Sequence, residues 1–327
     1  MKFTLALSLI AAAGLAKAQN SPGSDTGNCY TGRYNFTSAR AYNAANPTDV
    51  SPDPTIFDWV VTPGSKVAYN SDGSVTFTLQ PGSASGMSMT RFIKFGKVTG
   101  RIVTATSVGA VTGFITISEK HGTASDGSGA TSQINDEIDW EVLGKDTSHP
   151  ETNFFDYQSS KMERGMHGGP ISGSITANTQ HDFTIDWRSD GISWIVDGNQ
   201  MRYQSQNTSF AKDGGLPAGT PWFPTQPSRV ALSLWDGGAS VASWAGGPTD
   251  FSKPVTATFS YVDVQCYDSS NNPVQKWPAS APNPAVNTSP TNGNTGVTYS
   301  KNTAVSTRGV SVLCGIASIF ALFYIAA

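Results

Sequence analysis

The chain has 327 residues, and its 24 acidic and 21 basic side chains give a formal net charge of −3. This balance excludes the strongly basic surface that proteins use to bind nucleic acid or anionic membranes. The low charged fraction of 14%, the 33 glycines and the 10% of aromatic residues are typical of a secreted β-protein.

The N-terminal residues 1–18 have the pattern of a secretory signal peptide. Lys2 precedes an apolar run, and the small residues of Ala16-Lys17-Ala18 indicate cleavage before Gln19. A buried or membrane helix is the alternative, but the run is short for a bilayer span. Three glycosylation sequons agree with a secreted protein and predict surface positions at Asn35, Asn207 and Asn287.

Two of the three cysteines lie near the ends of the predicted core. Cys29 and Cys266 would pass through an oxidising compartment, so we expect one disulfide between them, with two free thiols as the alternative. Cys314 lies in the C-terminal tail and should be removed with it.

Apolar and polar residues alternate with a period of two through the middle of the chain, and no helical stripe is found. The alternation predicts short strands at residues 75–79, 183–187, 192–196, 230–234 and 255–261. Asp197-Gly198 predicts a hairpin turn, and the glycine pairs at 237–238 and 246–247 predict bends or close backbone approach. The small, polar residues 119–133 are interpreted as a loop. Together these features indicate an all-β sandwich of two antiparallel sheets.

The loop leads into NDEIDWEVLG, residues 135–144, which places four carboxylates in six positions. Side chains alternate between the two faces of a strand. Glu137, Asp139 and Glu141 therefore share one face. Asp136 points the other way, at the start of the strand, and the apolar residues between the acidic ones suit a sandwich core.

Three carboxylates along one face repel one another, so this face is not typical of ordinary surface. Calcium is an alternative, but it needs six to eight oxygens and usually takes them from turning loops. Two carboxylates also cleave glycosidic bonds, one as nucleophile and one as acid/base. Glu137 and Glu141 have Cα atoms about 13 Å apart on an extended strand, and a concave sheet can bring their carboxyl groups together. Asp139 lies between them and can tune both.

The E-I-D-W-E strand resembles the active-site strand of family 16 glycoside hydrolases, which are concanavalin-like β-jelly-roll sandwiches. The surrounding sequences FIT, NFF, HDFTIDW, ISWIVDG, SLWDGG and SWAGG are similar to those of the fungal Crh-type GPI-anchored cell-wall transglycosylases. The likeness spans about Asp58 to Cys266. It implies a concave glycan-binding cleft with Glu137 as nucleophile, Asp139 as auxiliary acid and Glu141 as acid/base.

This resemblance implies a retaining enzyme that cleaves a β-linked wall glycan and transfers the cut end to an acceptor. By resemblance the donor is chitin and the acceptor is β-glucan or chitin. No cofactor or metal is implied, and we expect a monomer. A hydrolytic β-1,3-glucanase or chitinase of the same fold is the enzyme alternative, and a wall lectin or structural mannoprotein is the non-enzyme alternative. The chain departs from the family pattern in its long 119–133 segment and in the missing glycine after residues 153–158.

Four aromatic residues are candidates for sugar stacking, because rings stack on the apolar faces of sugars. Trp235 and Trp244 lie in glycine-flanked segments, and by resemblance they line the donor side of the cleft. Phe155 and Tyr157 are further candidates. The alternative for each is a place in the core. The four histidines show no zinc-binding spacing.

The C-terminal sequence has the pattern of a GPI-attachment signal: a polar Pro/Thr/Asn-rich stretch, small residues and a terminal apolar run. A retained membrane span is the alternative, but no basic residues follow it. We therefore predict a glycosidase domain at 19–275, a stalk with the attachment region at 276–305 and a removed signal at 306–327. The protein would lie in the cell wall and on the outer face of the plasma membrane.

Overall fold

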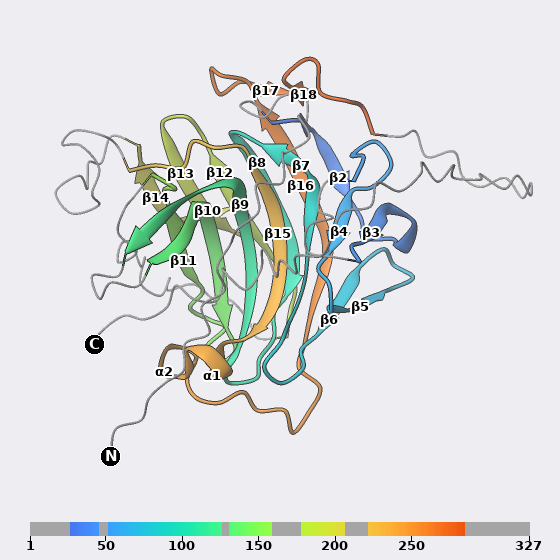
Figure 1. Cartoon of the computed structure of the whole chain (residues 1–327), viewed down its shortest axis with the longest axis vertical. Helices are drawn as coiled ribbons and strands as arrows, with labels where there is room; N and C mark the ends of the chain where they lie inside the picture. Colours follow the sequence, from blue (N-terminus) through green and yellow to red (C-terminus); the bar gives the residue numbers. More distant parts are fainter. Residues whose placement is uncertain (1–26, 46–51, 126–130, 159–177, 207–221, 285–327) are drawn as a thin grey trace, which may run out of the picture.

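The computed structural model describes residues 27–45, 52–125, 131–158, 178–206 and 222–284. Two β-sheets pack face to face in these residues (Figure 1), which confirms the predicted all-β sandwich. Helix in the described part is limited to the 3₁₀ turn Ser38–Arg40 and two single turns, α1 (Gly237–Ser240) and α2 (Ala242–Ala245). Within these ranges no helix has the length and apolar character needed to cross a membrane.

The first sheet carries the acidic motif and has seven strands in the described residues. In order across the sheet they are β11 (Glu151–Phe155), β10 (Thr131–Leu143), β9 (Ala110–Ser125), β15 (Ser228–Asp236), β7 (Ala84–Ile93), β4 (Trp59–Val61) and β3 (Ala41–Asn43). Neighbouring strands are antiparallel except β3 and β4, which are parallel. The acidic strand β10 therefore lies one place from the edge, between β9 and β11.

The second sheet covers the apolar side of the first. Its main strands, in order, are β14 (Asn199–Ser205), β13 (Gly191–Val196), β12 (His181–Trp187), β8 (Gly96–Val103), β16 (Thr256–Tyr267), β6 (Val75–Thr78) and β5 (Lys66–Tyr69), and β2 (Gly32–Tyr34) and β17 (Pro273–Val274) also pair with β16. Asp197 and Gly198 both have positive φ, 48° and 81°, and form the predicted hairpin turn between β13 and β14.

Alternation along each strand fills the core from both sheets. On β10 the apolar residues between the carboxylates are at most 2% exposed and belong to the main core cluster. The Trp140 indole donates a hydrogen bond to the Thr184 carbonyl at 3.0 Å, and the Trp194 indole donates one to the Asp139 carbonyl at 2.9 Å. These two bonds cross the sandwich and fix β10 against the second sheet.

The described parts of the predicted loop 119–133, residues 119–125 and 131–133, are strands, and residues 126–130 lie outside the described residues. β9 and β10 continue through this segment as a hairpin, paired from Asn135–His121 out to Thr131–Ser125. We call residues 118–125 and 131–136 the hairpin arm. The prediction is wrong because small polar residues have weak strand propensity, whereas pairing with a neighbouring strand decides the structure here. At its base three β9 residues lie opposite Asp136, a bulge of the kind that bends a strand pair.

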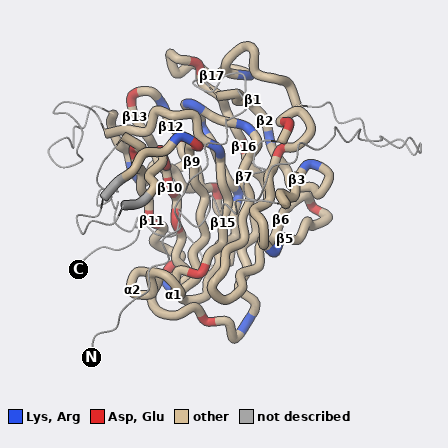
Figure 2. The backbone as a smooth tube through the Cα atoms, viewed as in Figure 1, with Lys and Arg blue, Asp and Glu red and all other residues tan. Residues whose placement is uncertain are grey.

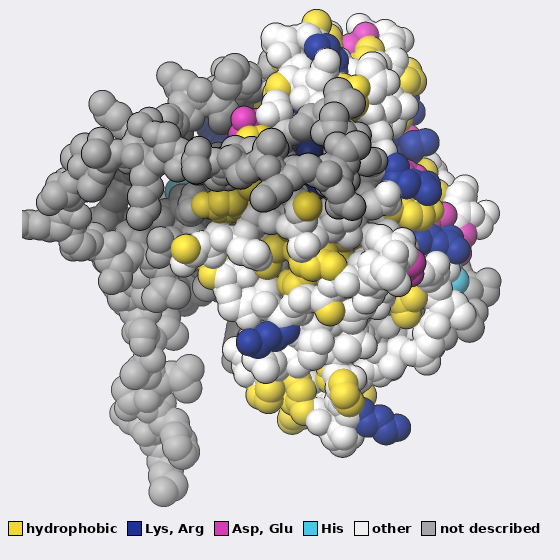
Figure 3. Space-filling model, turned by 90° about the vertical axis from the view of Figure 1, so that its right-hand side faces the viewer, with side chains coloured by type: hydrophobic (Ala, Val, Ile, Leu, Met, Phe, Trp, Pro, Cys, Tyr) yellow, Lys and Arg dark blue, Asp and Glu magenta, His cyan; other side chains and the backbone are white. Residues whose placement is uncertain are grey.

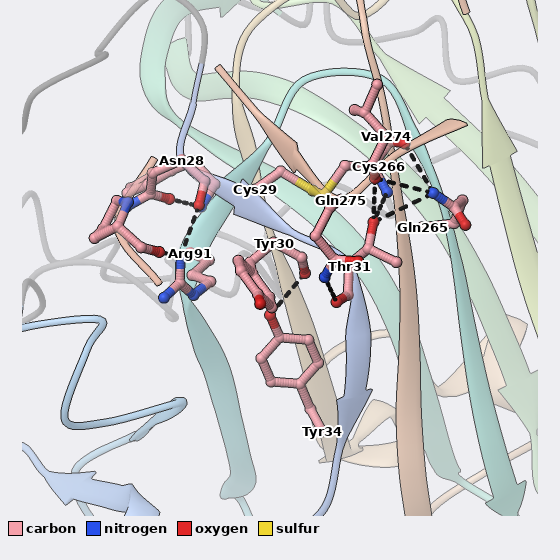
Figure 4. Close-up of a disulfide and its surroundings, with 12 residues drawn as sticks. Asn28, Cys29, Tyr30, Thr31, Tyr34, Arg91, Gln265, Cys266, Val274 and Gln275 are labelled. Carbon is pink, nitrogen blue, oxygen red and sulfur yellow. Dashed lines mark hydrogen bonds between the residues drawn. A yellow bond between two sulfur atoms is a disulfide. The ribbon is translucent and has the colours of Figure 1, made fainter. Parts of the chain in front are cut away.

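The two ends of the described chain are tied together (Figure 4). Cys29 and Cys266 form the predicted disulfide, which links β1 (Cys29–Tyr30) to β16. β1 also pairs with β18 (Lys276–Trp277). The buried Arg91 guanidinium donates to the carbonyls of Asn28 and Pro282, at 3.1 and 2.8 Å.

The predicted domain end at residue 275 is therefore too early. Residues 276–284 are part of the fold although their polar sequence lacks a strand pattern, because backbone pairing and Arg91 hold them. The predicted signal peptide and GPI signal, and the sequons at Asn207 and Asn287, lie outside the described residues. Asn35 is exposed, as a glycosylation site requires. On the face shown in Figure 3 the charged side chains are few, and basic and acidic ones are interspersed, as the composition leads one to expect.

Removing the disulfide should destabilise the domain by about 5 kcal/mol, because the bond closes a loop between residues 237 positions apart. Replacing Cys29 and Cys266 together by alanine avoids a single free thiol. Denaturant unfolding of this variant and of the wild-type protein under non-reducing conditions measures the difference. A change of less than about 1 kcal/mol would contradict a stabilising role of the bond.

Candidate active site

Figure 2 marks the Asp and Glu positions in red along the backbone. The acidic residues Glu137, Asp139 and Glu141 alternate with the core residues of β10, so they lie on the face of the seven-stranded sheet that points away from the core. We call this the acidic face. Glu137, Asp139 and Glu141 are 8%, 2% and 7% exposed, and none of them forms a salt bridge with another described residue. By contrast, the Arg101–Asp182 pair on the second sheet is about one third exposed. The three carboxylates are therefore buried together without a basic partner.

The neighbouring strand β11 completes the acidic face. Its residues pair with those of β10 as Glu141–Glu151, Asp139–Asn153 and Glu137–Phe155. Directly opposite residues on antiparallel strands have Cβ atoms about 4.5–5.5 Å apart, so each carboxylate of β10 has a β11 side chain beside it. The sequence alone predicts a role for Phe155 but none for Glu151 or Asn153, because neither strand by itself reveals the register between β10 and β11.

We call Glu137, Asp139 and Glu141 the acidic row. Burial and mutual repulsion control how protons are distributed over these three carboxyl groups. Burial raises the pKa of Glu137 to about 7, and a hydrogen bond with Asp139 acts in the opposite direction. Burial, the charges of Glu137 and Glu141 and that same hydrogen bond raise the pKa of Asp139 far above its ordinary value. In this pair the Asp139 carboxyl therefore keeps its proton and donates a hydrogen bond to the Glu137 carboxylate, so Glu137 ionises before Asp139.

For Glu141, every cause that shifts the pKa raises it. Burial and the negative charges of Glu137 and Glu151 raise its pKa well above its ordinary value. The row therefore combines Glu137, which has a pKa of about 7, with Asp139 and Glu141, in which burial and neighbouring charges favour the protonated form. This is the division of roles that a nucleophile and a general acid require.

Two buried polar atoms in the middle of the row have no hydrogen-bond partner among the described residues. They are Oδ1 of Asp139 and Nδ2 of Asn153, which lie opposite each other across the strand pair. Oδ1 of Asn153 accepts the Phe154 N–H at 2.9 Å, so its Nδ2 is left as a free donor. Unpaired buried polar atoms are costly, and an acceptor beside a donor suits a hydroxyl-bearing ligand. Within the described ranges no cluster of His, Cys, Asp and Glu is arranged to hold a metal ion.

The predicted sugar-binding aromatic residues flank the two ends of the row. Trp235 and Trp244 lie at the Glu141 end and stack with ring centroids 5.9 Å apart and an interplanar angle of 22°. Trp244 is half-buried, whereas Trp235 is 1% exposed. Trp235 thus packs against Trp244 in a small core cluster, and its burial disfavours the direct sugar contact predicted for it.

Phe155 and Tyr157 lie at the Glu137 end of the row. Phe155 is opposite Glu137 and is 5% exposed, similar to the carboxylate beside it. Tyr157 is half-buried, with the ammonium of Lys120 from the hairpin arm 4.6 Å from its ring centre. The arm therefore contacts one of the candidate sugar-binding rings, and the sugar contacts of both rings stay predictions.

Asp136 lies outside the row, as predicted, and connects the segments beside it. Its fully buried carboxylate accepts the backbone N–H groups of Tyr157, Thr225 and Gln226. Burial and the charge of Asp156 raise its pKa to about 7. Asp136 thus joins the segment after β11 to the segment before β15 and fixes the end of the site near Glu137.

The family model for glycosyl hydrolases family 16 matches residues 55–253, which include the whole acidic row. The chain belongs to glycosyl hydrolase family 16. Among family 16 relatives, Crh-like protein 2 of Aspergillus fumigatus is 31% identical over 241 residues, which are 69% of this chain and 49% of that protein. Congo red hypersensitive protein 2 of Saccharomyces cerevisiae is 30% identical over 224 residues, which are 64% of this chain and 43% of that protein. The chain thus spans about half the length of the curated relatives it matches.

The solved structure titled Crh5 transglycosylase in complex with NAG is also similar to this family 16 chain. It has a TM-score of 0.54 and 29% identity, and the match covers 78% of this chain and 90% of that one. The apo form of the Crh5 transglycosylase gives a TM-score of 0.50 at the same identity. These likenesses confirm the predicted jelly-roll fold and the resemblance to Crh-type proteins.

The raised pKa values predict that the folded protein loses stability as the pH rises. Glu137 and Asp136 keep their protons up to about pH 7 in the folded state, but release them near pH 4 when unfolded. Their contribution is complete below about pH 4 and is lost as the pH rises through about 7, on the order of 3 kcal/mol for each group.

Denaturant unfolding at about pH 5 and about pH 8 measures this fall, and Glu137→Gln should reduce it because glutamine does not titrate. Equal unfolding free energies of the wild-type protein at both pH values would contradict the buried, protonated carboxylates.

Proposed function

We propose that this family 16 chain is a retaining glycosidase and transglycosylase of the fungal cell wall. It cleaves a β-linked glycan, with chitin as the donor, and transfers the cut end to a β-glucan or chitin acceptor. The observation that carries the proposal is the buried row of Glu137, Asp139 and Glu141 on one face of β10, in which a hydrogen bond from Asp139 lowers the pKa of Glu137 while burial and neighbouring charges raise the pKa values of Asp139 and Glu141. The Crh-type relatives, and a similar structure that is a transglycosylase in complex with NAG, support the choice of substrate. NAG is the sugar unit of chitin.

The first half of the reaction uses both glutamates in different protonation states. The Glu137 carboxylate attacks the anomeric carbon of the donor, and the bond from that carbon to the leaving oxygen breaks. Glu141 gives its proton to the leaving oxygen, so the departing glycan leaves as a neutral alcohol. Asp139 donates its hydrogen bond to Glu137 beforehand, which keeps Glu137 ionised and oriented for attack.

The second half returns the enzyme to its starting state. Glu141, now a carboxylate, takes the proton of an acceptor hydroxyl while the acceptor oxygen attacks the anomeric carbon and displaces Glu137. A glycan acceptor gives transfer and water gives hydrolysis. Each 1.36 kcal/mol of preferential acceptor binding changes the ratio of the two rates tenfold. Asn153 Nδ2 and Asp139 Oδ1 are the free polar atoms nearest to these steps.

The cellular setting follows from the ends of the sequence and completes the proposal. A signal peptide, a polar stalk and a GPI signal would place the enzyme in the wall and on the outer face of the plasma membrane. Glycosylation at the exposed Asn35 fits this route. A monomer is sufficient for the proposed chemistry, because the row of carboxylates is contributed by one strand.

Glu137→Gln should reduce turnover at least about a thousandfold, because the amide is a poor nucleophile, while binding of chitin oligomers is kept. Turnover and oligomer binding are measured on the same preparation. Asp72→Asn is the matched control, since it makes the same change of charge in an exposed turn before β6. Turnover of Glu137→Gln equal to that of the control would remove Glu137 from the reaction.

Incubation with chitin oligomers and a labelled β-glucan oligosaccharide should give a labelled hybrid that is longer than the acceptor. Mass spectrometry of the products, together with an assay of new reducing ends, separates transfer from hydrolysis. New reducing ends without any labelled hybrid would show a hydrolase of the same fold and overturn the transglycosylase proposal.

A further inference from the structure

Glu151 adds a fourth carboxylate to the acidic face. It is half-buried on β11 and pairs directly across the strands with Glu141. The three carboxylates of the acidic row all belong to β10, so Glu151 is the acidic group that reaches Glu141 from a different strand. Like charges directly opposite on paired strands are destabilising, which means that this arrangement needs a compensating feature.

Trp244 provides that feature by holding the Glu151 carboxylate in place. Its indole Nε1 donates a hydrogen bond to Oε2 of Glu151 at 2.9 Å. The indole ring is itself stacked on the buried Trp235 of β15, and the backbone carbonyl of Trp244 accepts a hydrogen bond from the ammonium of Lys145. The position of Glu151 is therefore set by three elements: β11, β15 and the helical turn α2.

The hydrogen bonds divide the Glu141–Glu151 pair into two unequal partners. The Glu151 carboxylate accepts the N–H of Trp244, whereas Glu141 has no hydrogen bond from any described residue. The charge of Glu151, directly opposite on β11, is one of the causes that raise the pKa of Glu141.

The other charged groups around Glu141 do not weaken this conclusion. Along β10, the charge of Glu137 raises the pKa of Glu141. Asp139 lies between them, and its own pKa is raised, which favours its neutral form. The β9 residue opposite Glu141 is a glycine. Lys145, in the turn after β10, directs its ammonium to the carbonyl of Trp244. Glu151 is the part of this environment that a substitution can remove without touching the acidic row.

We propose that Glu151, held by the indole of Trp244, is a positioning residue for Glu141, which it keeps protonated until the leaving oxygen takes the proton. This inference rests on the proposed function of Glu141 as the acid/base. In the second half of the reaction the same anion favours return of a proton to Glu141, so it assists deprotonation of the acceptor. Glu151 itself forms no bond to the sugar.

Glu151→Gln tests the proposal, because glutamine has the same size and its carbonyl oxygen can still accept the Trp244 N–H. Loss of the anion lets Glu141 release its proton at lower pH. The descending limb of the profile of kcat/KM against pH should move to lower pH by roughly one unit, while the ascending limb, set by Glu137, stays in place. Activity on the alkaline side should fall about tenfold.

Two further variants separate charge from position. Asp263→Asn makes the same change of charge on the second sheet, where Asp263 pairs with the exposed Arg33, and it should leave both limbs unchanged. Trp244→Phe keeps an aromatic ring but removes the N–H, and it should move the descending limb in the same direction as Glu151→Gln. An unchanged descending limb in Glu151→Gln, with an active wild-type protein, overturns the proposal.

A stability measurement tests the same contact without any catalytic assay. The fall in unfolding free energy between about pH 5 and about pH 8 should be smaller in Glu151→Gln than in the wild-type protein. The difference should vanish when both chains also carry Glu141→Gln, as a double-mutant cycle requires for a direct contact.

A protein that neither cleaves nor transfers glycans, yet shows this coupling, would refute the proposed function while keeping the Glu141–Glu151 contact. Absence of the coupling would refute the role of Glu151 whatever the activity.

Discussion

The strict alternation of β10 between two opposite environments is the constraint on which the site depends. One side of this strand inserts Ile138, Trp140 and Val142 into the core, and the other side therefore must carry every residue between them. Two indole hydrogen bonds that cross the sandwich, from Trp140 and from Trp194, prevent the strand from shifting. A slip of one residue would place three carboxylates in the core and three apolar residues on the acidic face.

The fold places negative groups together and then distinguishes them by hydrogen bonds. No cation neutralises the row within the described residues, so burial and repulsion favour protonation throughout. Two hydrogen-bond donors distinguish the groups: the proton of Asp139 is directed at Glu137, and the indole N–H of Trp244 is directed at Glu151. Glu141, which lies directly opposite Glu151, has no such donor among the described residues.

The sequence allowed accurate prediction wherever a feature depends on residues close together in the chain. The period of two was enough to put Glu137, Asp139 and Glu141 on one face and Asp136 outside it, and two cysteines on a secretory route were enough to pair them. The errors concern contacts between distant segments. Residues 119–125 and 131–133 are strands because β9 and β10 pair with each other, and residues 276–284 belong to the fold because β1 and Arg91 hold them.

Glu151 was missed for the same reason. Its importance comes from its partners on β10 and α2, and nothing in its local sequence indicates either partner. The burial of Trp235 under Trp244 likewise depends on how the turn after β15 folds back over that strand.

The closure of the chain ends at β1, β16 and β18 also governs the orientation of the whole molecule. The described chain leaves the fold beside β18, while α1 and α2 mark the opposite pole, close to Glu141 and Trp244 (Figure 1). If the protein is tethered through its C-terminal end, the tether is attached at the pole where the disulfide links β1 to β16. The Glu141 end of the acidic face then lies at the pole far from the tether. The length of the tether would therefore set the radius within which this end of the site can reach glycan strands.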